Sequence, residues 1–445
     1  MNAPDGYYDG LNEKLLDAVP DVGNVLELGC ANGRLGRRYK ELHPRARWYG
    51  VDVSADAVAT AALVLDGSFK LDLDVDSLAG VGSEYDAIVI GDLLEHLKEP
   101  ERVLSRLRDV STAEARLVCC VPNMAHITVL ERMLAGDITY DENGLLDKTH
   151  LRFFSPGSIV KMFLDSGWMP HLADHYWVTH PNLAFADALI ATGATLGVPK
   201  KTVEGNMYMY QLIVECTKVP DVQPVGGPPF TVIVAVNRDH QLQANLLHSP
   251  GLAEVNPQVV LCRDATSAAE AFERGLQQAE SPWVIYAHQD VYFPKNSGYA
   301  LRRLFASIPE NEAADTLIGF AGIALDEQSR ACKSGLAIDR LHRFDFPASD
   351  RGISIDEFAV AVHRSTRHRL DRELGWHLWA TDLCLAAAVH GRPMAKIVRI
   401  PLFHNSFGDS IPPPDLFASA VRLGEKYPTV PVIPTLHGDI GAPAR

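Results

Sequence analysis

The stretch VLELGCANGRLG, residues 25–36, decides the fold of the N-terminal half of the chain. It starts with an apolar run of strand length, a glycine turn follows, and we expect a helix to begin near Gly33. Glycines at 29 and 33 let the backbone pass close to a ligand because no Cβ intervenes, and the first N–H groups of the helix then face that ligand. The stretch therefore predicts a strand, turn and helix that together bind a small molecule.

An acidic residue follows this turn at a spacing that suits a ribose. Asp52 lies 19 residues after Gly33, at the end of the strand-like segment WYGVDV. One carboxylate can accept hydrogen bonds from both ribose hydroxyls, so the pair fits any nucleoside cofactor. The dinucleotide fingerprint G-x-G-x-x-G is matched less well, because Ala31 and Arg34 stand where it has its second and third glycines. NAD is therefore the weaker alternative.

Apolar runs of strand length alternate with amphipathic helical segments from Asn24 to Pro122, which is typical of βαβ units around a parallel sheet. Two later strand-like segments, 172–179 and 207–217, predict a closing hairpin at the sheet edge. The first domain is then expected to span residues 1–218. Its other expected strands are 24–28, 47–53, 68–72, 86–91 and 116–121, and its expected helices are 33–43, 54–65 and 99–110.

The segment VPDVQPVGGPP, residues 219–229, contains four Pro and two Gly, a composition that resists both helix and sheet. It predicts an interdomain linker. A second α/β alternation follows and predicts another domain over residues 230–445. The strands expected there are 230–236, 258–262, 283–287, 316–323, 355–363 and 396–402, and the helices are 266–280 and 377–390.

The composition limits the classes of function. A chain of 445 residues, 47% hydrophobic and 22% charged, is expected to form two or three globular cores. With 41 basic and 56 acidic residues the net charge is −15, which disfavours a nucleic-acid partner. Seven Cys without metal-type spacing, and no signal-like start, predict reduced thiols and a cytoplasmic location. The apolar stretch 183–198 is shorter than the roughly 20 residues of a membrane span, so no integral membrane segment is expected.

Four motifs follow one another in the first domain: ELGCANG (27–33), GVDVS (50–54), LDLD (71–74) and DAIVIGDLLEHLKEP (86–100). In this order they resemble the class I S-adenosylmethionine-dependent methyltransferases, over about residues 20–217, and imply a Rossmann-like sheet. By this resemblance the cofactor would be held at its methionine end by Glu27, Gly29, Cys30 and Gly33, at its ribose by Asp52 with Val53 beside it, at its adenine by Asp72 and Leu73, and beneath its sulfonium by Asp92.

Two further segments, VPNMAHI (121–127) and LLDKTHLRFFS (145–155), resemble a methyltransferase subgroup found beside enzymes of sugar and cell-envelope biosynthesis. Methyl transfer to a hydroxyl needs a base, and His is the usual candidate near neutral pH. His96, His126 and His150 all lie in or just after loops at the expected ligand-binding edge. We expect His126 or His150 to act as the base. The alternative for each is a hydrogen bond to a loop backbone.

The second domain shows TVIVAVN (231–237), then AHQDVYFP (287–294), WHLWATDLC (376–384) and IPLFHNS (400–406). This order resembles the family-2-like glycosyltransferases of GT-A fold, over about residues 230–410. By this resemblance Asp290 would bind Mn²⁺ or Mg²⁺, His404 would be a second ligand, and Asn237 and Asp290 would mark the nucleotide-sugar pocket. The alternatives are a turn or N-cap role for Asp290 and a solvated loop position for His404.

The sequence departs from the second resemblance at Glu273, where relatives tend to have Asn, and at the position expected for the catalytic base. Relatives carry an acidic residue two positions before the Asp that matches Asp382, as the expected base for the acceptor hydroxyl, and this chain has Ala380 there. Either Asp382 or another group takes that role, or the domain binds the acceptor without catalysing transfer.

Together these features predict a bifunctional enzyme that methylates a hydroxyl or amine of a sugar, glycan or glycosylated metabolite and transfers a sugar from a nucleotide-sugar donor. One alternative is a methyltransferase whose second domain binds the acceptor or serves as a scaffold. Another is a protein that senses S-adenosylmethionine without turnover. The sequence leaves open the acceptor, the donor sugar and the oligomeric state.

Overall fold

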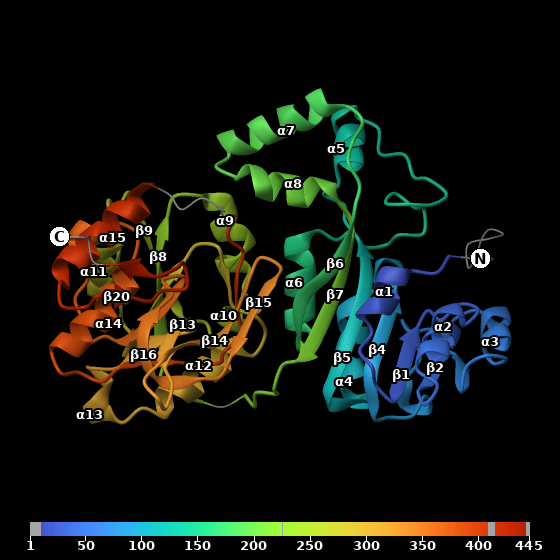
Figure 1. Ribbon diagram of the computed structural model, residues 1–445, viewed down its shortest axis with the longest axis horizontal. Coiled ribbons are helices and arrows are strands. Elements are labelled where there is room, and N and C mark those ends of the chain that lie inside the picture. The colour runs from blue at the N-terminus through green and yellow to red at the C-terminus, as the bar shows by residue number, and fades with distance from the viewer. Residues whose placement is uncertain (1–9, 225, 408–413, 442–445) are drawn as a thin grey trace. The chain divides into compact units, whose positions relative to one another are not determined.

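The computed structural model describes residues 10–224, 226–407 and 414–441. The chain divides into two compact units, Met1–Pro220 and Asp221–Arg445 (Figure 1). The boundary lies inside the Pro- and Gly-rich segment, and the described residues between 219 and 229 form neither helix nor strand. None of the described helices has both the length and the apolar character that crossing a membrane requires.

Unit 1 is built on a sheet of seven strands in the order β3-β2-β1-β4-β5-β7-β6. The first five strands are parallel, as predicted, and β7 runs antiparallel to β5 and β6, which confirms the expected closing hairpin. The strands are β1 (Asn24–Leu28), β2 (Arg47–Asp52), β3 (Gly67–Lys70), β4 (Tyr85–Gly91), β5 (Ser111–Pro122), β6 (Trp168–Trp177) and β7 (Met209–Lys218). The helices are α1 (Glu13–Ala18), α2 (Arg34–Leu42), α3 (Ala55–Ala61), α4 (Pro100–Val110), α5 (Ile127–Leu134), α6 (Pro156–Asp165), α7 (Leu183–Thr195) and α8 (Lys200–Tyr208), with a 3₁₀ turn η2 (Leu94–His96).

The alternation of apolar residues along the strands places helices on both faces of this sheet. Val25, Val89 and Val118 belong to one buried cluster that also contains residues of α1, α2 and α3. Their sequence neighbours point to the opposite face, which α4 and α6 cover (Figure 1). The strand order reverses between β1 and β4, since β1 connects through α2 to β2 on one side and β4 lies on the other. In open α/β sheets the crevice at the carboxyl ends of such a strand pair is where ligands bind.

Unit 2 contains a mixed sheet of 12 strands among the described residues. The strands β9, β8 and β10 at one end are parallel to one another, and β17 pairs antiparallel with β10. The strands are β8 (Phe230–Val236), β9 (Gln258–Arg263), β10 (Trp283–His288), β11 (Val291–Tyr292), β12 (Leu317–Gly319), β13 (Ala321–Leu325), β14 (Ala331–Asp339), β15 (His342–Phe346), β16 (Ser349–Ile355), β17 (Ala359–His363), β18 (Ala395–Ile397) and β19 (Leu402–His404). Helices α9 (Asp239–Ala244), α10 (Pro250–Ala253), α11 (Ala268–Gln278), α12 (Ser297–Ala306), α13 (Glu310–Ala313), α14 (Trp379–Val389) and α15 (Pro414–Lys426), and the short pair β20 (Val432–Ile433) and β21 (Ile440–Gly441), complete the unit.

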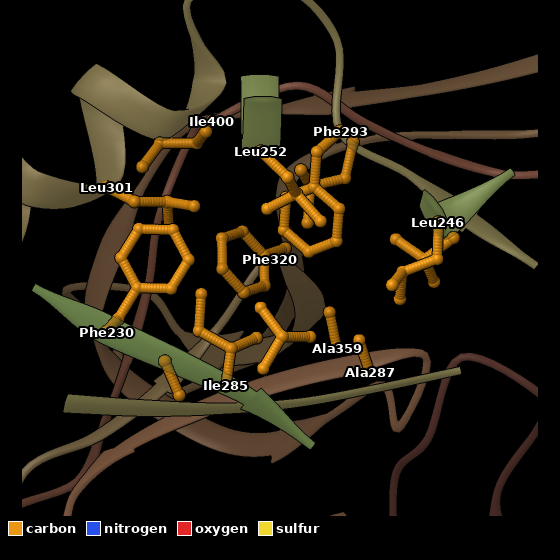
Figure 2. Packing of buried hydrophobic residues seen from close by; sticks show 14 of the residues in the cluster. Phe230, Leu246, Leu252, Ile285, Ala287, Phe293, Leu301, Phe320, Ala359 and Ile400 are labelled. Atoms are coloured by element: carbon orange, nitrogen blue, oxygen red, sulfur yellow. The ribbon is translucent and has the colours of Figure 1, made fainter. Parts of the chain in front are cut away.

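Two buried clusters fill the two faces of the unit 2 sheet. Figure 2 shows one of them, in which Phe230, Phe293 and Phe320 gather with Leu252 of α10 and Leu301 of α12. The other cluster packs α11 and α14 on the opposite face. Both clusters contain residues of β8 and β10, which pair in parallel, so the carboxyl ends of these two strands lie side by side.

Three of the expected strands in unit 2 are divided in the structure. The segment 316–323 forms β12 and β13, which meet different neighbours, because β12 pairs with β17 and β18 whereas β13 pairs with β14 and β16. The segment 355–363 holds the end of β16 and the whole of β17, and 396–402 holds parts of β18 and β19. The strands β14 and β15 were not predicted, since their exposed polar residues hide the apolar alternation.

Candidate functional site

A cavity of about 830 Å³ opens in unit 1 at the carboxyl ends of β1 and β4. This is the position at which the strand order reverses, and the volume is in the range of small-molecule sites, about 300–1,000 Å³. The cavity is lined by every residue predicted to bind the cofactor except Gly33, namely Glu27, Gly29, Cys30, Asp52, Val53, Asp72, Leu73 and Asp92. The sequence motifs therefore converge on one site.

The loop after β1 is fastened to the end of β2 through Asp52. Gly29 and Ala31 have positive φ angles of 72° and 45°, which turn the chain sharply under the cavity. The N–H of Ala31 donates to Asp52 Oδ2 at 2.9 Å and the N–H of Ser54 donates to Oδ1 at 2.8 Å. Because a carboxylate offers about four lone-pair positions, both oxygens keep capacity for the hydroxyls of a ribose.

Gly33 has a structural position rather than a place in the cavity wall. It is the N-cap of α2 at φ 75°, in the left-handed region that favours glycine. A Cβ there would lie 3.0 Å from Val64 Cγ2 and 3.1 Å from Leu65 Cγ. Gly33 does not line the cavity, so the structure does not support the predicted direct contact with the cofactor. The residue instead provides the left-handed backbone conformation at which α2 begins.

Glu27 and Cys30 form a buried part of the cavity wall, and burial favours the uncharged form of both side chains. The carboxyl of Glu27 accepts the indole N–H of Trp48 at 2.7 Å. Burial raises the pKa of Glu27 to about 8, and the charge of Asp52 adds to this rise. Burial likewise raises the pKa of the Cys30 thiol far above its usual range, so Cys30 is not a thiolate nucleophile.

The strand ends β3 and β2 supply a partly apolar side to the cavity. Leu73 is buried and Val53 is 63% exposed, and both line the cavity. Asp72 lies in a tight turn in which its Oδ1 accepts the N–H of Asp74 at 3.0 Å. An apolar wall beside a fixed carboxylate suits a flat heterocycle with exocyclic N–H groups.

Asp92 lies at the end of β4, with a positive φ of 46°. Its Oδ1 accepts hydrogen bonds from Gln211 Nε2 at 2.6 Å and from the Cys120 thiol at 3.6 Å. Burial raises the pKa of Asp92 to about 6, although these two hydrogen bonds oppose the rise. Asp92 is thus a carboxyl on the cavity wall whose ionisation is opposed by burial and favoured by these two hydrogen bonds.

Of the three predicted base candidates, His96 and His150 line the cavity. Their ring centroids are 4.9 Å apart with an interplanar angle of 70°. His96 Nδ1 lies 3.2 Å from the carbonyl oxygen of Thr149, and His150 Nδ1 lies 3.1 Å from that of Leu145. A carbonyl oxygen can only accept, so Nδ1 of each ring is the donor in these contacts, and Nε2 is the ring nitrogen that can offer a lone pair.

His126, unlike His96 and His150, lies outside the cavity, and its contacts argue against the expected role as base. It does not line the cavity and it is fully buried as the N-cap of α5. Its Nε2 lies 3.0 Å from the Val178 carbonyl oxygen and its Nδ1 lies 2.9 Å from Thr128 Oγ1, so both ring nitrogens are engaged. The alternative weighed for this residue, a structural hydrogen bond, fits its geometry better.

Sequence reasoning missed several residues of the cavity wall. Glu95 lines the cavity and stands directly before His96 in the motif 86–100, and this position was the available signal in the sequence. Gln211 is a polar residue directly before the apolar run 212–214 in β7, which was a second signal. Asn12 and Leu15 of the α1 region also line the cavity, and nothing in their local pattern indicated it.

In unit 2 the predicted metal-binding residues come together with one more ligand. His404 Nε2 lies 3.4 Å from Asp290 Oδ1 and 3.4 Å from His288 Nδ1. Although burial alone would raise the pKa of Asp290, the neighbouring His404 lowers it to about 2, and burial with His404 lowers the pKa of His288 to about 4. On its other side His404 Nδ1 faces Asp339 Oδ1 at 3.3 Å. His288 was part of the quoted HQD motif but was not predicted as a ligand.

The predicted nucleotide residue Asn237 follows β8, next to the end of β10. The side chain of Gln289 joins the two strand ends. Its Oε1 accepts the N–H groups of Asn237 at 3.0 Å and Arg238 at 2.9 Å, and its Nε2 donates to Asn237 Oδ1 at 2.5 Å. Since β9 lies on one side of β8 and β10 on the other, Asn237 and Asp290 flank a second reversal of strand order.

Asp382, predicted as a possible base, is fully buried in α14. Its carboxylate lies 2.8 Å from Lys426 Nζ and accepts the hydroxyl of Tyr427 at 2.7 Å, both at the end of α15. These contacts give it a structural function, which argues against the predicted catalytic role. Ala380 is buried as well and offers no acid in its place.

Residues 26–117 match the family described as "Methyltransferase domain". The match spans β1 to β5 and includes the loop after β1, Asp52, Asp72, Asp92 and His96. No curated protein matches the chain.

Several solved methyltransferase structures are similar to part of this chain at low sequence identity. The YcgJ protein of Bacillus subtilis is 14% identical, covers 47% of this chain and 100% of its own, and has a TM-score of 0.34. An S-adenosylmethionine-dependent methyltransferase from Mesorhizobium loti is 18% identical, covers 47% and 99%, and has a TM-score of 0.33. An O-methyltransferase of a polyketide synthase from Brevibacillus brevis, solved with S-adenosyl-L-homocysteine, is 14% identical, covers 47% and 72%, and has a TM-score of 0.31.

Residues 26–117 are thus similar to a methyltransferase domain, and they lie within the α/β sheet of unit 1, whose first five strands are parallel. The predicted resemblance of residues 230–410 to glycosyltransferases stays a prediction.

Proposed function

We propose that unit 1 transfers a methyl group from S-adenosylmethionine to a hydroxyl or amine of a sugar, glycan or glycosylated metabolite. The observation that carries this proposal is the convergence of the methyltransferase motifs on one cavity at the reversal of strand order. The residues present fit the cofactor, because Asp52 keeps acceptor capacity for two ribose hydroxyls and Leu73 offers an apolar wall to adenine. When bound, S-adenosylmethionine supplies a methyl group on a positively charged sulfur.

The chain's own residues have distinct parts in this function. Asp52 orients the ribose, and Asp92 places a carboxyl group on the wall near the predicted sulfonium position. His150 or His96 accepts the proton of the acceptor hydroxyl on Nε2, since Nδ1 of each ring is held by a backbone carbonyl. His126 has no part in this step, because both of its ring nitrogens are engaged outside the cavity.

An acceptor screen tests this proposal. Full-length protein is incubated with S-adenosylmethionine labelled in its methyl group and with free sugars, glycosides and nucleotide sugars, and label in each acceptor is counted. We expect transfer to at least one sugar-containing acceptor. Cofactor binding without transfer to any acceptor would instead favour the alternative of a protein that senses S-adenosylmethionine.

For unit 2 we propose a glycosyl transfer from a nucleotide-sugar donor held between Asn237 and Asp290. The support is the meeting of Asn237, Asp290 and His404 with His288 and Gln289 near the ends of β8 and β10. A set of two imidazoles and one carboxylate suits Mn²⁺ better than Mg²⁺, which prefers oxygen ligands. His288, Asp290 and His404 would hold the cation, which would neutralise the charge of a diphosphate leaving group.

Calorimetric titration of the full chain with UDP, GDP and dTDP, each with and without Mn²⁺, tests this donor site. We expect one of the three nucleotides to bind only with Mn²⁺, and Asp290→Ala to lower that affinity at least about tenfold. The exposed Asp350→Ala variant is the matched control and keeps the affinity. If none of the nucleotides binds, unit 2 is an acceptor-binding or scaffold unit and the protein is a methyltransferase only.

A further inference from the structure

A second group of ligand-type side chains lies inside the unit 1 cavity. One ligand atom each of Glu95, His96 and His150 lies within 4.8 Å of the others, and all three residues line the cavity. Glu95 and His96 belong to the turn η2, whereas His150 comes from the loop before α6. The N–H groups of Leu151 and Arg152 donate to the Glu95 carbonyl oxygen at 2.7 and 3.0 Å. These backbone bonds fix the loop against the turn.

The two imidazoles are oriented as metal ligands are. A histidine that binds a metal almost always donates its other ring N–H to a carbonyl or carboxylate, which fixes its tautomer and its orientation. His96 and His150 each do so from Nδ1, to the carbonyl oxygens of Thr149 and Leu145. Among the described residues neither Nε2 has a hydrogen-bond partner, so both keep a lone pair for a cation.

The carboxylate supplies an independent observation. Glu95 is 1% exposed, and its Oε2 is buried without a hydrogen-bond partner in the described part of the chain. A buried, unpaired carboxylate oxygen is costly unless a cation or a donor meets it. Burial, together with the nearby charges of Asp92 and Asp147, raises the pKa of the Glu95 carboxyl well above its usual range. In the described ranges no Lys or Arg forms an ion pair with Glu95, Asp92 or Asp147. The site is therefore short of positive charge.

We propose that Glu95, His96 and His150 bind a divalent first-row transition-metal cation, and that this cation binds a methyl acceptor through two adjacent oxygen atoms. Two imidazoles and one carboxylate leave about three positions of a six-coordinate cation open. Two neighbouring oxygens, as in a vicinal diol, fill two of them with a chelate ring. Metal binding stands by itself, whereas the acceptor class rests on the proposed methyl transfer.

With the cation bound, the Nε2 lone pairs of His96 and His150 hold the metal, so the role of base given to these histidines in the proposed function applies only to a site without the cation. A metal lowers the pKa of a bound hydroxyl toward neutrality, so the proton passes to solvent water and leaves a metal-bound alkoxide. A lone pair of that oxygen forms the bond to the methyl carbon, the bond between carbon and sulfur breaks, and its electron pair stays on sulfur. The sulfonium thus becomes the neutral thioether of S-adenosylhomocysteine.

Titration with Mn²⁺ alone, followed by the loss of its free paramagnetic resonance signal, tests the metal site. The full chain carries Asp290→Ala and His404→Ala so that the unit 2 cluster does not bind. We expect one Mn²⁺ per chain, and at least about a tenfold loss of affinity in Glu95→Gln and in His150→Gln. Glu99→Gln, an exposed carboxylate three residues beyond His96, is the matched control. In the otherwise unchanged chain Glu95→Gln lowers the number of bound Mn²⁺ ions by one.

Calorimetry with S-adenosylhomocysteine on the same proteins separates this inference from the proposed function. Normal binding of that ligand without any Mn²⁺ site in unit 1 overturns the metal inference and leaves the methyltransferase proposal standing. A Mn²⁺ site that depends on Glu95, in a chain that does not bind S-adenosylhomocysteine, supports the metal site and contradicts the proposed function.

The acceptor class is tested by two isomeric probes. Catechol has adjacent hydroxyls and resorcinol does not, so only catechol can form a five-membered chelate ring. We expect catechol to change the resonance spectrum of the bound Mn²⁺ and resorcinol to leave it unchanged. Equal effects of both probes, or none, overturn the chelated acceptor.

Discussion

Replacement of Asp52 by alanine will weaken the binding of S-adenosylhomocysteine at least about 100-fold. Hydrogen bonds to a charged group are worth about 1.5–3 kcal/mol each, and a 100-fold loss corresponds to about 2.7 kcal/mol. The carboxylate of Asp52 is positioned to accept two ribose hydroxyls. It also holds the N–H groups of Ala31 and Ser54, so its removal loosens the loop under the cofactor. Isothermal titration calorimetry at 25 °C measures the change.

Two further variants show whether the loss arises from the carboxylate. Asp52→Asn keeps the shape of the side chain and one carbonyl oxygen, and we expect a smaller loss of about tenfold. Asp56→Ala removes an exposed acidic residue from the first turn of the next helix, outside the cavity, and the affinity is expected to stay within about twofold. Equal affinities in Asp52→Ala and the unsubstituted chain would refute the assigned ribose site.

Replacement of Asp382 by alanine will lower the stability of unit 2 by about 2–3 kcal/mol. Removing one partner of a buried ion pair typically costs about 3–5 kcal/mol, because the other charge is left without compensation. The cost here falls below that range, since Lys426 is partly exposed and keeps Asp371 at 2.9 Å. The hydroxyl of Tyr427 also loses its acceptor.

Differential scanning calorimetry with and without S-adenosylhomocysteine identifies the affected unit. A ligand raises the unfolding temperature of the unit that binds it, so the transition that does not respond belongs to unit 2. We expect Asp382→Ala to lower that transition by about 5–10 °C. Glu425→Ala, an exposed residue on α15 next to Lys426, is expected to lower it by less than about 2 °C. An unchanged transition in Asp382→Ala would return this residue to the list of catalytic candidates.

The parallel part of the unit 1 sheet could be predicted because the signals for its strands and turns lie in short, continuous stretches of the sequence. The central strands β1 and β4 are apolar runs followed by turn signals, and Asp52 and Asp92 stand at the ends of β2 and β4. The reversal of strand order between β1 and β4 then brings the motifs to one edge without any further information.

The grouping of Glu95, His96 and His150 in the cavity wall was harder to predict from the sequence. His150 follows His96 by more than fifty residues, and its position depends on the hydrogen bonds that tie its loop to the Glu95 carbonyl. The sequence showed three histidines near the site but not that His126 would be used to cap α5. The role of Glu95 depends on its burial and on an unpaired oxygen, which only the fold reveals.

Unit 2 shows the same contrast. The strand ends with Asn237 and Asp290 were predicted, but β14 and β15, toward the other end of the sheet, were not, because exposed residues interrupt the apolar pattern in both strands. The position of Asp382 next to Lys426 and Tyr427 results from the packing of α15 on α14, which leaves no local trace in the sequence.

The central claim is that the cavity at the ends of β1 and β4 binds S-adenosylmethionine. Calorimetric titration of the full-length protein with S-adenosylmethionine, followed by displacement with S-adenosylhomocysteine, tests it most directly. We expect one binding site per chain and complete competition between the two ligands. No heat of binding for either ligand, in a protein shown to be folded by its unfolding transitions, would contradict the proposed function.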